Sequence, residues 1–77
     1  MPHIIVKLYK GRSEDQKAQL ADEIARTVIR VLGSNDKSVS VAIEDFDPAE
    51  WAAKVYKPDI LDQPKSLYKK PGYNPFE

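Results

Sequence analysis

The chain opens with "MPHIIVKLYKGRSEDQK", in which a proline directly follows the first methionine. Proline cannot donate a ladder hydrogen bond, and the first residue of a strand is one of the few places where a sheet tolerates it. If Met1 is removed, however, Pro2 becomes the N-terminus and its ring nitrogen becomes a secondary amine. Such an amine is a base and a nucleophile that needs neither a metal nor a cofactor. Pro2 is therefore the first candidate for a catalytic residue.

The other residue types support few alternative enzyme chemistries. Among 77 residues there is no cysteine and a single histidine, His3. Disulfides and thiolate zinc sites are therefore excluded, and one histidine cannot build a metal site unaided. The sequence contains no G-x-S-x-G motif and no phosphate-binding glycine loop, so nucleophilic triads and nucleotide binding have no support. We therefore expect neither a cofactor nor a metal.

Charge and size limit the possible partners. Twelve basic and twelve acidic residues cancel, and no basic stripe is present, which argues against nucleic-acid binding. The apolar runs are too short to span a membrane, and Lys7 and Lys10 interrupt any region of signal-peptide type. We therefore expect one cytoplasmic domain over residues 1–77. A domain this short buries only about 60% of its unfolded surface, and without disulfides or metals the remaining stabilising device is oligomerisation.

Hydrophobic periodicity predicts three regular elements in the first 46 residues. Residues 3–9 and 38–46 alternate between apolar and polar side chains, which indicates strands. Between them, Ser13 and Gln16 form a capping-box pattern that predicts a helix from about residue 14 to residue 32, ended by Gly33. The predicted apolar face of this helix consists of Leu20, Ile24, Val28 and Val31, widened by Ala21, Ala25 and Leu32.

These elements predict an α+β fold built on a βαβ unit with two parallel strands and a right-handed crossover. A two-stranded sheet with both edges open is not stable alone, and a second copy of the chain is the simplest cover. Asp47 as N-cap and Pro48 at the first helical position predict a short helix. Pro58 and Pro64 are expected to interrupt the chain beyond this helix, and a second short helix is expected to end near Tyr68. The final "KKPGY" segment predicts a turn and a tail, a candidate arm for a partner subunit.

Two segments at a fixed spacing carry a resemblance to a known family. "MP" opens a strand, "GRSEDQK" opens a helix, and Arg12 follows Pro2 by ten residues. In these features the chain resembles the 4-oxalocrotonate tautomerase family of the tautomerase superfamily. Its length, "KKPGY" and Trp51 make it most similar to the branch typified by a dimeric phenylpyruvate tautomerase. The resemblance covers about the first 46 residues and, through that branch, the tail.

The resemblance implies a role for each of four residues. Pro2 would be the general base that moves a proton between carbon and oxygen of a small, aromatic α-keto acid, and Arg12 would bind the substrate carboxylate. Trp51 would keep the site apolar. Ser40 stands where the main family has a second arginine that polarises the substrate carbonyl, and the dimeric branch has a serine there. Because the strands are expected to be parallel, Ser40 should lie near Pro2, and we include it among the substrate-binding candidates.

Other interpretations of the same residues stay open. Apart from the resemblance, purely structural roles are favoured: Pro2 starts a strand, Arg12 is a solvated loop residue, and Trp51 is a core or interface anchor. His3 is expected on the outward face of its strand, without a catalytic role. A non-catalytic homodimeric binding module, or a hydratase or dehalogenase type of activity, remains an alternative to the tautomerase. In each case we expect a homo-oligomer, with a dimer favoured and a hexamer as the alternative, and for the enzymes a small-molecule substrate.

Overall fold

The computed structural model describes all residues from 1 to 77 and contains two strands and four helical segments. In chain order they are β1 (His3–Tyr9), α1 (Glu14–Leu32), η1 (Asp36–Ser38), β2 (Ser40–Phe46), η2 (Pro48–Glu50) and η3 (Ala52–Leu61). The chain divides into two compact units, Met1–Asp45 and Phe46–Glu77.

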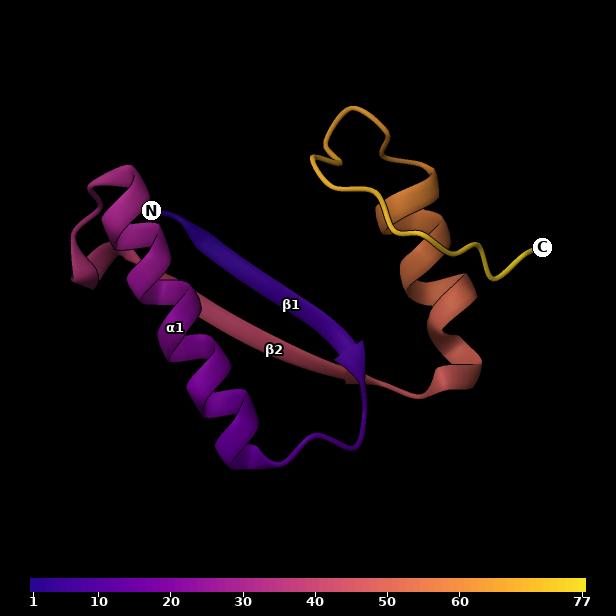
Figure 1. Cartoon of the computed structure of the whole chain (residues 1–77), viewed down its shortest axis with the longest axis horizontal. Coiled ribbons are helices and arrows are strands. Elements are labelled where there is room, and N and C mark those ends of the chain that lie inside the picture. Colours follow the sequence, from indigo (N-terminus) through magenta and orange to yellow (C-terminus); the bar gives the residue numbers. More distant parts are fainter. The chain divides into compact units, whose positions relative to one another are not determined.

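The first unit is the predicted βαβ arrangement. β1 and β2 pair in a two-stranded sheet, and α1 connects them and covers one face (Figure 1). β1 spans the predicted residues. β2 begins at Ser40, two residues later than the alternation indicated, because the preceding residues form the short helix η1. The side chain of Asn35 accepts a hydrogen bond from the backbone N–H of Lys37 (3.0 Å), and the Ser38 hydroxyl donates to the Asn35 carbonyl (2.7 Å).

Both ends of α1 obey the capping rules that the sequence indicated. The Ser13 side chain accepts from the backbone N–H of Gln16 (3.1 Å), and the Gln16 side chain accepts from the backbone N–H of Ser13 (3.1 Å). At the other end Gly33 adopts the left-handed conformation with φ 69°, and its N–H donates to the Ile29 carbonyl (2.9 Å). Glycine reaches this conformation without the steric penalty of a Cβ atom. The predicted bounds of the helix are confirmed.

The apolar face of α1 differs in part from the prediction. The half-buried residues are Ala21, Ile24, Ala25, Val28 and Ile29, which repeat at the three- and four-residue spacing of one helix face. Leu20 is 37% exposed, Val31 is 63% exposed and Leu32 is 66% exposed, so the predicted stripe is wrong at these three positions. Val31 falls off the face that Ile29 extends, and Leu32 occupies the last residue of the helix, where no further turn shields it.

The second unit begins as predicted and then departs from prediction. The Asp47 carboxylate accepts from the backbone N–H of Ala49 (3.4 Å), and Pro48 is the first residue of η2. Pro58, however, lies inside η3 and does not interrupt it. Proline clashes with the carbonyl four residues earlier in an α-helix, whereas η3 is a π-helix, whose wider turns bond residues five apart. The N–H of Asp62, for example, donates to the Lys57 carbonyl (2.9 Å).

The chain beyond η3 contains turns in place of the expected second helix near Tyr68, whose side chain is fully exposed. The aromatic residues of the tail pack on η3 of the same chain. The ring of Tyr56 lies 5.5 Å from that of Tyr73 and 5.9 Å from that of Phe76, between centroids. The tail therefore packs within its own unit, and its contact with a partner subunit stays a prediction.

The hydrophobic core is small. Val55 and Tyr56, at 3% and 6% exposure, are the buried residues of the chain. On the sheet face opposite α1, Ile5 and Tyr9 are each about half exposed. None of the helices has the length and apolar character needed to cross a membrane.

Candidate active site

The start of β1 and the start of β2 lie next to each other. The backbone N–H of Ser40 donates to the carbonyl of Pro2 with a distance of 3.1 Å. Pro2 is half-buried and Met1, ahead of it, is fully exposed. The structure thus brings two of the four predicted residues together, as the parallel pairing of the strands requires.

A side-chain contact across the two strands joins His3 to Ser40. The Nδ1 atom of His3 lies 2.7 Å from the Ser40 hydroxyl oxygen, and the tautomer of the imidazole decides which group donates. Both residues are exposed and both begin their strands. We assigned no role to His3 from the sequence. The outward alternation of both residues, combined with parallel register, was a signal that could have revealed the pair.

Arg12 lies at the other end of β1, beside a groove at the start of α1. The chain turns after Tyr9, and Gly11 has φ 118°, a conformation that L side chains rarely adopt. The groove has a volume of about 210 Å³ and is open to solvent. Its lining residues come from β1, the turn and α1: Leu8, Arg12, Gln16, Lys17 and Leu20.

The two cations at this groove differ in their partners. The ammonium group of Lys17 lies 2.9 Å from a carboxylate oxygen of Asp45 and 2.9 Å from one of Glu14. The hydrogen bond to Asp45, followed by that to Glu14, raises the pKa of Lys17 above its usual 10.5. Lys17 is only 16% exposed, and its charge is compensated within the unit. Arg12 is exposed and forms no ion pair with a carboxylate of the chain.

Pro2 and Arg12 are held apart by the strand between them. β1 has seven residues, and at about 3.3 Å per residue its length is roughly 23 Å. A small α-keto acid cannot contact residues at both ends of such a strand. Within one chain, therefore, the structure does not bring Arg12 to Pro2.

Trp51 belongs to the second unit, at the junction of η2 and η3. Its indole N–H donates to the Tyr73 hydroxyl (2.7 Å), and its ring meets that of Phe46 edge to face, with centroids 6.2 Å apart at 82°. The tail therefore fixes the orientation of the indole. Because the one polar atom of the indole is already bonded, the rest of the ring presents an apolar surface.

Comparison with known proteins defines the class first. Residues 2–57 match the family model described as "Tautomerase enzyme". TomN, described as a 4-oxalocrotonate tautomerase homologue in the tomaymycin biosynthetic pathway, has a similar solved structure with a TM-score of 0.63 and 32% identity, over 65% of this chain and 77% of that one. A 4-oxalocrotonate tautomerase homologue called TTHB242 gives a TM-score of 0.63 at 27% identity, over 71% of this chain and 87% of that one.

Curated relatives extend over nearly the whole chain. A protein of Xylella fastidiosa named "Probable tautomerase" is 49% identical over 95% of this chain and 89% of its own length. "Tautomerase PptA" of Escherichia coli is 41% identical over 96% of this chain and 99% of its own length. The chain belongs to the tautomerase family, and it has the fold of the 4-oxalocrotonate tautomerases. Its family membership assigns it to the isomerases, with a tautomerase activity.

Proposed function

We propose that this protein is a cofactor-free keto–enol tautomerase, a single domain whose N-terminal proline, freed by removal of Met1, is the general base for a small, aromatic α-keto acid. The Pro2 nitrogen takes a proton from the enol hydroxyl, and the resulting N–H returns a proton to the neighbouring carbon as the carbonyl forms. No electron donor or acceptor is required. The observation that carries the proposal is the position of Pro2, half-buried directly before β1, with a fully exposed Met1 ahead of it.

The charges beside the groove support a carboxylate substrate. Asp45 and Glu14 compensate Lys17, whereas Arg12 has no acidic partner in the chain. A guanidinium group binds a carboxylate through two parallel hydrogen bonds, which fix its orientation as well as its position. Arg12 is therefore the residue that we assign to the substrate carboxylate.

Two further residues complete the proposed site. The Ser40 hydroxyl lies at the Pro2 end of the sheet and is held by His3, so it is suited to bind the oxygen of the substrate carbonyl. Trp51 is the candidate for an apolar wall, because its N–H is bonded to Tyr73. An apolar wall and nearby cations both lower the pKa of an amine. A lower pKa leaves more of the proline in the neutral form that a general base needs at pH 7.

The roughly 23 Å length of β1 favours a site shared between subunits. Two chains related by a two-fold axis, with their first strands antiparallel, would bring Arg12 of one copy to Pro2 of the other. The same packing would cover Ile5 and Tyr9, which are about half exposed on the open sheet face. It would also add apolar contacts to a chain in which only Val55 and Tyr56 are buried. We therefore propose a homodimer, with a hexamer as the alternative assembly.

The base is tested by changing the N-terminus in two ways. Pro2→Ala leaves a primary amine and should lose most of the tautomerase activity, whereas a preparation that retains Met1 should lose roughly 10²- to 10⁴-fold because its proline nitrogen is an amide. Enol-to-keto conversion is followed by absorbance, the state of the N-terminus by mass spectrometry, and the fold by circular dichroism. Pro64→Ala is the matched control. Activity of Pro2→Ala within about twofold of the parent protein would contradict the proposal.

The shared site is tested by complementation. Inactive Pro2→Ala and Arg12→Ala chains are mixed under conditions that exchange subunits. Half of the dimers should be mixed, and one of the two sites in each mixed dimer is intact, so roughly a quarter of the parent activity should return. If native mass spectrometry shows mixed dimers and no activity returns, the two residues do not meet across a subunit interface.

A further inference from the structure

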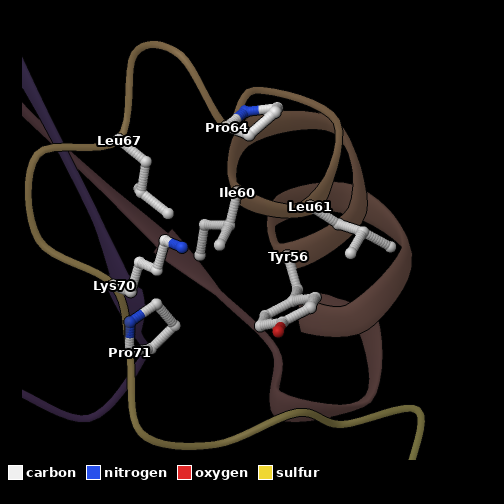
Figure 2. A pocket seen from close by; sticks show the side chains of 7 residues that line it. All are labelled: Tyr56, Ile60, Leu61, Pro64, Leu67, Lys70 and Pro71. Atoms are coloured by element: carbon white, nitrogen blue, oxygen red, sulfur yellow. The ribbon is translucent and has the colours of Figure 1, made fainter.

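The second unit contains a pocket that the proposed tautomerase chemistry does not use. Its volume is about 200 Å³, and it is open to solvent. Its lining comes from η3 and from the chain beyond it: Tyr56, Ile60, Leu61, Pro64, Leu67, Lys70 and Pro71. In Figure 2 the side chains of Ile60, Leu67 and Lys70 lie close together between the helix and the returning loop.

One charged group enters a lining that is otherwise apolar. Lys70 is the single charged residue of the pocket, and in Figure 2 its ammonium group points toward Ile60. No carboxylate of the chain pairs with it. Lys57 in the same unit differs from Lys70 in having a partner, because its ammonium group lies 3.0 Å from a carboxylate oxygen of Asp62.

The remaining polar group of the lining is already used. Tyr56 is buried, and its hydroxyl donates to the Tyr73 carbonyl (3.3 Å). Its ring therefore offers the pocket an apolar surface. Lys70 is left as the one group that can fix the orientation of a polar ligand, and it is a donor without acceptor capacity.

We infer that this pocket binds a small carboxylate with an aromatic or aliphatic body, held through the carboxylate by Lys70. A single ammonium group matches one negative charge, and the apolar walls formed by Ile60, Leu67 and Pro71 match the body of the ligand. A dianion such as phosphate would find one cation and no further donors. An uncharged apolar molecule would leave the ammonium group near Ile60 without a counter-ion.

The probe is 3-phenylpropionate, which lacks the keto group and cannot turn over. It is titrated into the full-length protein, and the methyl resonances of Ile60, Leu61 and Leu67 are followed by NMR. We expect saturable shifts of these resonances with the acid and none with 3-phenylpropionamide. Lys70 is exposed, so Lys70→Gln should weaken binding by about fivefold, the upper range for an exposed ion pair. Lys69→Gln, which removes the neighbouring charge, should leave the dissociation constant unchanged.

Arg12→Ala separates this pocket from the proposed substrate site. In that variant the shifts of Ile60, Leu61 and Leu67 should persist with the same dissociation constant. Equal binding of acid and amide, or equal effects of Lys70→Gln and Lys69→Gln, would overturn the inference. It would also be overturned if the methyl shifts followed protein concentration rather than the acid, since a second copy of the chain would then occupy the pocket.

Discussion

Replacing Arg12 by alanine measures how far the groove that we propose for the substrate carboxylate is covered in the active assembly. The guanidinium group is exposed and has no acidic partner in the chain. If the groove stays open to water, the ion pair with a substrate is worth about 0.2–1 kcal/mol, and the loss in kcat/KM would be about 1.4- to 5-fold. If a second subunit excludes water, truncating the pair costs about 2–4 kcal/mol, which corresponds to a loss of about 30- to 900-fold.

The shared site predicts the larger loss, expressed mainly as a higher KM. The assay follows the enol form of an aromatic α-keto acid by absorbance and compares the acid with its amide. Arg12→Ala should remove the preference for the acid, and the amide should be insensitive to the change. Arg30→Ala is the matched control, since Arg30 is also an exposed arginine of the first unit but lies in the last turn of α1. Undiminished discrimination between acid and amide, or a loss below about fivefold, would refute the reasoning.

Three further outcomes, each measured by urea unfolding, test contacts within one or the other unit. The pKa of Lys17 is raised in the folded state, so its bond to Asp45 stabilises the fold below pH 10.5 and is lost as pH rises through the higher folded pKa. The difference in free energy of unfolding between the parent protein and Asp45→Asn should therefore decrease in that pH range. A difference that does not change with pH would contradict the role of this bond. Ser13→Ala should cost about 1 kcal/mol through loss of the N-cap, and an equal effect of Ser66→Ala would contradict it. Tyr73→Phe should cost about 0.5–1.5 kcal/mol and alter the fluorescence of the single tryptophan; an unchanged spectrum would contradict the indole bond.

Local rules predicted the first unit well because its signals are short in range. The alternation of β1, the capping box at Ser13 and the glycine at position 33 each depend on residues within one or two turns. The two errors there have local causes as well. Asn35 caps the short helix η1, so β2 begins later than predicted. The apolar residues of α1 cover more than one helix face, so the sequence alone could not show whether Ile29 or Val31 faces the sheet.

The second unit was harder to predict because its contacts join distant residues. The hydrogen bond between Trp51 and Tyr73 joins residues 22 positions apart, and no sequence periodicity predicts it. Pro58 was expected to interrupt the chain, because proline disrupts the hydrogen bonding of an α-helix. η3 is a π-helix, to which this rule does not apply. For the candidate site, the proximity of Pro2 and Ser40 was predictable from parallel pairing. The contact between His3 and Ser40 needed the register as well as the alternation.

The geometry of β1 explains both the small core and the separation of Pro2 from Arg12 within one chain. Alternation gives one face of the strand to α1 and leaves Ile5 and Tyr9 on the other, about half exposed. A second copy of the chain, packed on the face that carries Ile5 and Tyr9, would bury these side chains and cover the open sheet. The same strand separates Pro2 from Arg12 by roughly 23 Å. A partner subunit that covers the open face with an antiparallel strand would both bury the apolar side chains and bring its Arg12 to Pro2. Stability and catalytic activity should therefore be lost together when the assembly is diluted below its dissociation constant.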